Sequence, residues 1–140
     1  MQARFGLEQN PDLMLMVFVG RWSHQKGIDL IADVAEWLLT THKCQMVVVG
    51  PIVDNHGTYA LNKLKPLQAR FSSHLFVQGR FFRVPMELHA ATDICLMPSR
   101  DEPFGCAHWV HLSRATVSPP SATVFRKKIK SRHLASTGDA

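Results

Sequence analysis

The sequence has 140 residues, of which 46% are hydrophobic and 19% are charged. This length and composition predict one globular domain or part of one, and they exclude a wholly disordered chain. The net charge of +5 arises in residues 111–140, which contain six of the 16 basic residues and one of the 11 acidic residues. Because residues 1–110 carry no net charge, we expect no nucleic-acid partner.

The cysteines and the hydropathy bear on location. The three cysteines are an odd number without paired spacing, which favours a reducing compartment and predicts a cytoplasmic protein. The sequence contains neither an apolar run long enough to span a bilayer nor a signal-type apolar segment near residue 1. We therefore expect no membrane segment in this chain.

The first 100 residues alternate between strand and helix patterns. The nearly unbroken apolar run at residues 13–19 is typical of a parallel strand buried on both faces. Apolar residues then recur three and four apart over residues 28–39, which predicts an amphipathic helix. The same patterns predict further strands at residues 45–49, 75–78 and 94–97 and further helices at residues 58–71 and 85–91. Pro66 lies inside the first of these two helices and should kink or divide it.

This alternation predicts an α/β fold, with a doubly wound, Rossmann-like parallel sheet and helices on both faces. We expect the globular domain to cover residues 1–110. Residues 111–140 are predicted to form a basic tail, unstructured from residue 113, because no apolar period survives from about residue 106 onward. Trp22 and Trp37 are interpreted as packing residues.

The loop at residues 20–27 follows the first strand and precedes the first helix. In a parallel sheet, ligands bind beyond the carboxyl ends of the strands, where this loop lies. Arg21, Lys26 and the free amides of the helix N-terminus could together hold an anion such as a diphosphate. The alternative, which composition alone favours, is a solvated loop with two surface cations.

The loop at residues 98–105 follows the fourth strand and ends at the same edge of the sheet. Gly105 would let backbone amides approach a phosphate or sugar, and Glu102 could accept hydrogen bonds from sugar hydroxyls. The alternative is a tight acidic turn that caps the next helix. Two such loops at one edge support a binding site more strongly than either does alone.

Both loops resemble motifs of one family. The segment 19–29, VGRWSHQKGID, resembles the R-x4-K-G-x-D motif of glycogen and starch synthases, and PSRDEPFG at residues 98–105 resembles the start of their E-x7-E motif. With VGPIVD at residues 49–54, the chain is most like the synthase domain of fungal cell-wall α-1,3-glucan synthases over about residues 1–105. These enzymes are retaining glucosyltransferases with the GT-B fold, in which two Rossmann-like domains face a cleft.

The resemblance implies roles for individual residues. Arg21 and Lys26 would bind the diphosphate of UDP-glucose or ADP-glucose and stabilise the departing nucleotide, and Glu102 would contact the donor glucose. The acceptor would be a growing α-glucan, and neither a cofactor nor a metal is implied. A full-length relative would be membrane-bound, with this domain on the cytosolic face of the plasma membrane. The remaining donor-site residues would be Gly20, Phe104, Gly105 and Cys106.

The sequence also departs from the family pattern. Val110 stands where the family has the second glutamate of E-x7-E, and the resemblance stops near Cys106. Cys106, His108 and His111 lack a fourth ligand with suitable spacing, so no metal site is expected. We therefore expect an incomplete C-terminal half of a GT-B enzyme that is inactive alone. The alternative is a non-catalytic truncated product or regulatory fragment with at most weak nucleotide binding.

Overall fold

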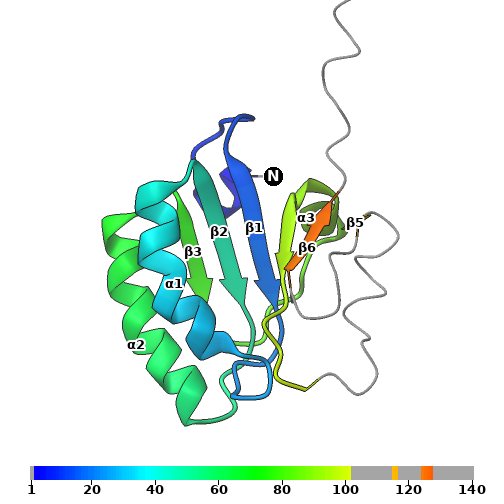
Figure 1. Cartoon of the computed structure of the whole chain (residues 1–140). Coiled ribbons are helices and arrows are strands. Elements are labelled where there is room, and N and C mark those ends of the chain that lie inside the picture. The colour runs from blue at the N-terminus through cyan, green and yellow to red at the C-terminus, as the bar shows by residue number, and fades with distance from the viewer. Residues whose placement is uncertain (1, 102–114, 117–123, 128–140) are drawn as a thin grey trace, which may run out of the picture.

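The computed structural model describes residues 2–101, 115–116 and 124–127. Its centre is a six-stranded sheet with the order β3-β2-β1-β4-β6-β5 (Figure 1). The first four strands are parallel, whereas β6 runs antiparallel to both of its neighbours. The strands are β1 (Met14–Val19), β2 (Cys44–Val49), β3 (Leu75–Gln78), β4 (Ile94–Leu96), β5 (Ala115–Thr116) and β6 (Val124–Lys127).

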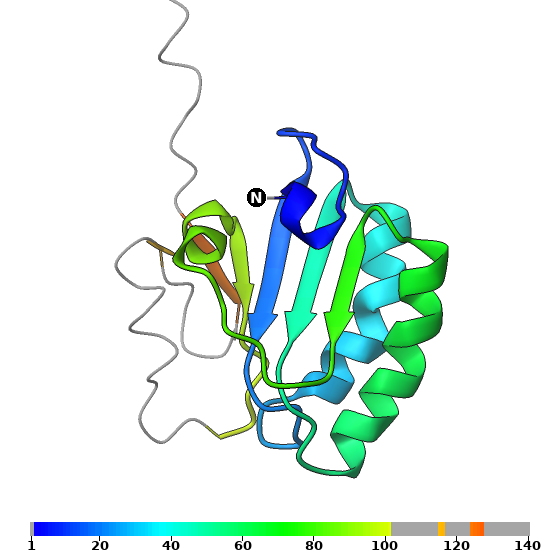
Figure 2. The ribbon, with the colours of Figure 1, turned by 180° about the vertical axis from the view of Figure 1, so that it is seen from behind.

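Helices cover both faces of the sheet, as the alternating pattern predicts. The helices α1 (Ile28–Thr41) and α2 (Asn55–Arg70) lie side by side on one face (Figure 1). The short helices η1 (Gln2–Phe5) and α3 (Met86–Ala91) lie on the other face (Figure 2). The chain therefore has the Rossmann-like α/β architecture that its sequence predicts.

Two hydrophobic cores explain why the strands are apolar throughout. Successive side chains of a strand point to opposite faces, so Met46 and Val48 of β2 pack beneath α1 and α2. Val47 and Val49 pack on the opposite face with Phe5 of η1. All six residues of β2 are buried, which accounts for the absence of polar and apolar alternation.

Helix α2 begins earlier than predicted and continues through Pro66. The side chain of Asp54 accepts hydrogen bonds from the backbone amides of His56 and Gly57, and this N-cap sets the helix start. Of the two effects expected of Pro66, a kink or a division, the division does not occur. Leu64 and Leu67, on either side of it, are both buried in the core and hold the two turns against the sheet.

Two further predictions differ from the structure. Within residues 113–140, which were expected to be unstructured, the structure describes two short strands, β5 and β6, that extend the sheet beyond β4. The rest of that segment lies outside the described residues. Trp22 is fully buried as predicted, but Trp37 is 58% exposed on the outer face of α1 and does not pack in the core.

Within the part of the chain that the structure describes, no helix combines the length and the hydrophobicity needed to cross a bilayer.

We predict that Gly50→Ala destabilises the protein far more than Gly6→Ala. Gly50 has φ +149°, and a Cβ there would overlap the carbonyl oxygen of Gly20, so the loops after β1 and β2 would have to separate. The expected loss is about 3 kcal/mol of unfolding free energy in urea titrations. Gly6 has φ +66° with no atom within 4 Å of such a Cβ, so its substitution should cost only the conformational penalty, about 1 kcal/mol. Equal losses for the two variants would show that the loops are not in close contact.

Candidate functional site

The loops after β1 and β2 are joined by their backbones at the carboxyl edge of the sheet. The amide of Trp22 donates to the carbonyl of Pro51 at 2.8 Å, and the carbonyl of Trp22 accepts from the amide of Val53 at 3.1 Å. The buried indole of Trp22 anchors the same residue in the core. These main-chain contacts and the buried indole fix the first part of the loop, at Trp22, against the chain that follows β2.

Of the predicted site residues, Gly20, Arg21 and Lys26 lie on this one loop. Gly20 directly follows β1, and its amide donates to the carbonyl of Val49 at 3.2 Å. The exposed guanidinium of Arg21 donates to the side-chain oxygen of Gln25 at 3.4 Å, and within the described residues it pairs with no carboxylate. The remaining predicted residues, Glu102, Phe104, Gly105 and Cys106, lie outside the described residues.

The N-terminus of α1 lies where this loop meets the chain that follows β4. Gly27 is the N-cap residue with φ +70°, and no side chain among the described residues caps the first turn of the helix. The backbone amides of this first turn are therefore suited to bind an anion. A Cβ at position 27 would overlap the carbonyl oxygen of Pro98, so glycine permits the chain that follows β4 to pass directly over the start of α1.

Arg100 connects the chain after β4 to the loop after β1. Its guanidinium binds both carboxylate oxygens of Asp29, at 2.9 and 2.8 Å, and donates to the carbonyl of His24 at 2.7 Å. Its own amide donates to the carbonyl of Gln25 at 2.7 Å. The hydrogen bond from Arg100 lowers the pKa of Asp29, so the pair is fully charged at neutral pH. Sequence reasoning assigned no role to this pair, although both residues lie within the segments that carry the family motifs.

Asp54, in the chain that follows β2, binds the loop that follows β1. Besides capping α2, its carboxylate accepts the amide of His24 at 2.8 Å. The hydrogen bond from the His24 backbone is the main reason that the pKa of Asp54 is lowered. The imidazole rings of His24 and His56 lie next to each other above this contact, with centroids 4.6 Å apart.

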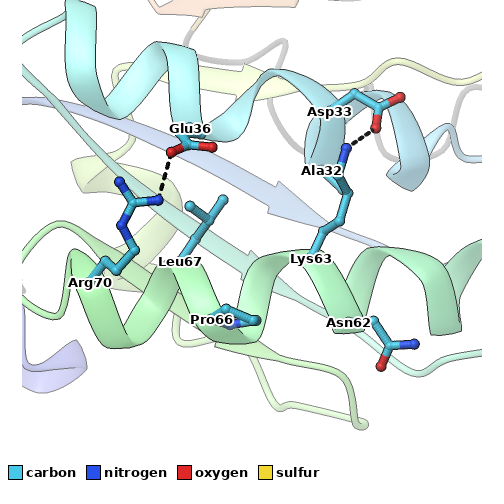
Figure 3. Close-up of a pocket in the computed structure, with 8 residues that line it drawn as sticks. All are labelled: Ala32, Asp33, Glu36, Asn62, Lys63, Pro66, Leu67 and Arg70. Carbon is cyan, nitrogen blue, oxygen red and sulfur yellow. Dashed lines mark hydrogen bonds and ion pairs between the residues drawn. The ribbon is translucent and has the colours of Figure 1, made fainter.

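A surface depression lies elsewhere, in the groove between α1 and α2 (Figure 3). Salt bridges cross it from Asp33 to Lys63 and from Glu36 to Arg70. Because its charged groups already pair with one another and it lies between the helices, it does not coincide with the site predicted from the sequence. The carboxyl edge, where loops from three strands meet, remains the candidate site.

Comparison with known proteins identifies the family. Residues 2–109 match the model of the family described as glycosyl transferases group 1. The chain belongs to this family. Its fold agrees, since the catalytic domain of starch synthase IV from Arabidopsis thaliana, solved with ADP and acarbose, superposes with a TM-score of 0.62 at 20% identity, over 79% of this chain and 22% of that one.

Curated relatives include synthases of α-glucans. The cell wall alpha-1,3-glucan synthase mok12 of Schizosaccharomyces pombe is 52% identical over 99 residues, which are 71% of this chain and 4% of the relative. Granule-bound starch synthase 2 of Pisum sativum is 34% identical over 119 residues, 84% of this chain and 15% of the relative. The chain thus spans a small part of the length of these relatives.

We predict that Asp54→Ala lowers the unfolding free energy by about 1 to 2 kcal/mol at pH 7, because three backbone amides lose their acceptor. The folded-state pKa of Asp54 lies below its ordinary value, so its contribution is present above about pH 4 and is lost as the pH falls through the lowered pKa. Urea titrations at pH 7 and pH 3 should show the difference between wild type and variant shrinking at pH 3. Asp12→Ala, a change of the same charge at an exposed position, serves as the control. A deficit for Asp54→Ala that is as large at pH 3 as at pH 7 would contradict this account.

Proposed function

We propose that this chain is the nucleotide-sugar-binding half of a retaining glucosyltransferase that extends an α-glucan. The donor would be UDP-glucose or ADP-glucose, and the product an α-1,3-glucan, in keeping with the 52% identity to an α-1,3-glucan synthase. The observation that carries the proposal is the meeting of the loop bearing Arg21 and Lys26 with the chain after β4 at one edge of the sheet. Membership of the glycosyl transferase family supports this reading, because an enzyme that transfers a sugar needs a site for the leaving group of the donor.

The charges at this edge suit a diphosphate leaving group. When the bond between C1 of glucose and the donor phosphate breaks, the electron pair stays on the phosphate oxygen, where negative charge develops. Cations and helix amides placed beforehand stabilise that charge without having to reorganise. Arg21 and Lys26 would supply the cations, and the uncapped start of α1 the amides. The acceptor hydroxyl then bonds to C1 and gives its proton to the departing phosphate oxygen, and the configuration at C1 is retained.

Glu102 completes the proposed site through the glucosyl group. By the motif match, its carboxylate would accept hydrogen bonds from sugar hydroxyls. Glu102→Ala should therefore weaken UDP-glucose binding while leaving UDP binding nearly unchanged, which distinguishes a sugar contact from a phosphate contact.

A second candidate function follows from Val110. An apolar side chain at the position of the second glutamate cannot accept a hydrogen bond from the donor ribose. The chain would then bind nucleotides weakly and act without catalysis, as a regulatory or inactive product.

We predict that the 140-residue chain binds UDP-glucose or ADP-glucose in calorimetric titrations, and that Arg21→Ala and Lys26→Ala each weaken binding by about tenfold or more. The matched control is Lys43→Ala, which removes one exposed cation just before β2, at the opposite edge of the sheet. Binding should survive this control within about twofold. A folded wild-type chain that binds neither donor, or one that responds equally to all three substitutions, would contradict the proposed donor site.

A further inference from the structure

The pair formed by Asp29 and Arg100 differs from the other ion pairs of α1. Its side chains are 15% and 33% exposed, against 47% and 45% for Asp33 and Lys63. It also joins two segments that are distant in the sequence, since Arg100 follows β4 and Asp29 lies in the first turn of α1. The exposed pair of Asp33 and Lys63 instead links two helices already packed through the core.

The contacts of Arg100 are directed into the protein. Its guanidinium donates to both oxygens of Asp29 and to the carbonyl of His24, so its charge is neutralised and its fork geometry is satisfied. Gln25 adds a second connection, because its side-chain amide donates to the carbonyl of Asp101 at 3.1 Å. The loop is thus tied on one side to the chain after β4, and the exposed guanidinium of Arg21 donates to the same Gln25 side chain.

We propose that Asp29 and Arg100 are positioning residues for donor binding, an inference that rests on the donor site proposed above. Their ion pair holds residues 20–27 against the chain after β4, so that Arg21 and Lys26 are in place before a diphosphate arrives. When the loop is already ordered in the free protein, ligand binding does not carry the entropy cost of ordering it. The affinity for the donor is higher for that reason. Arg100 also cancels the negative charge of Asp29, which would otherwise repel an anionic donor at the start of α1.

Asp29→Asn separates positioning from simple electrostatics. Removing a negative charge beside an anion site should strengthen donor binding if Coulomb attraction alone decides the affinity. Loss of the ion pair should weaken binding if the pair positions the loop. We expect calorimetry on the full 140-residue chain to show about tenfold weaker UDP-glucose binding for Asp29→Asn.

Changes at Arg100 and at a control pair extend the test. Arg100→Gln should weaken binding more than Asp29→Asn, because it also leaves the carboxylate of Asp29 uncompensated. Arg100→Lys, which keeps the charge without the two-pronged contact, should bind with intermediate affinity, and the double variant Asp29→Asn with Arg100→Gln should show less than the sum of the two losses. Asp33→Asn breaks an ion pair of the same helix away from the site, so binding should change by less than about twofold.

Amide hydrogen exchange tests, in the free protein, whether the ion pair orders residues 20–27. Amides of residues 20–27 should exchange faster in Asp29→Asn than in wild type or Asp33→Asn, while those of β1 and β2 remain unchanged. Faster exchange throughout the sheet would instead indicate general destabilisation and would overturn the inference. So would donor binding by Asp29→Asn that equals or exceeds that of the wild type. If the wild-type chain binds no donor, the proposed function itself fails. If the wild-type chain binds the donor and Asp29→Asn does not weaken that binding, only the positioning role fails.

Discussion

Burial of β1 on both faces is the constraint on which the rest of the structure depends. Val17 and Phe18 are almost completely inaccessible and belong to the two opposite cores, while β2 and β4 pair with the two edges of the strand. A strand held on four sides cannot shift its register without exposing one core and burying the wrong side chains in the other. The point where the chain leaves the sheet, at Gly20, is therefore fixed by packing. Everything proposed for the site depends on that exit point.

The cations of the described residues fall into groups with different surroundings. Lys63 and Arg70 of α2 pair with carboxylates of α1 on the open helical surface, where such pairs add little stability. Arg100 is tied to Asp29 and to a carbonyl at the sheet edge. Arg21 contacts a neutral amide at 3.4 Å. A cation whose only described partner is neutral can bind an anionic ligand without first breaking an ion pair. Among these cations, this holds for Arg21 and not for Lys63, Arg70 or Arg100.

The candidate site at the carboxyl edge of the sheet lies apart from the groove between α1 and α2. A diphosphate needs converging amides and cations more than an enclosed cavity, and the start of α1 with its adjoining loop provides them on a surface. The groove between α1 and α2 is a hollow, yet its charges are already satisfied (Figure 3). The groove between α1 and α2 therefore does not coincide with the candidate site.

The sequence by itself determined the four parallel strands, the two large helices and the loop that carries Arg21 and Lys26, because apolar periodicity and buried strands are local patterns. It also determined the family, through motifs that are short and continuous. Other features required the tertiary structure. Asp29 and Arg100 are separated by 71 positions, and only the return of β4 to the side of β1 brings them into contact. The pairing of β6 with β4 likewise depends on an available strand edge, which no local pattern in residues 113–140 reveals. Contacts between distant segments follow from how the sheet is ordered, and strand order is decided by packing of the whole chain.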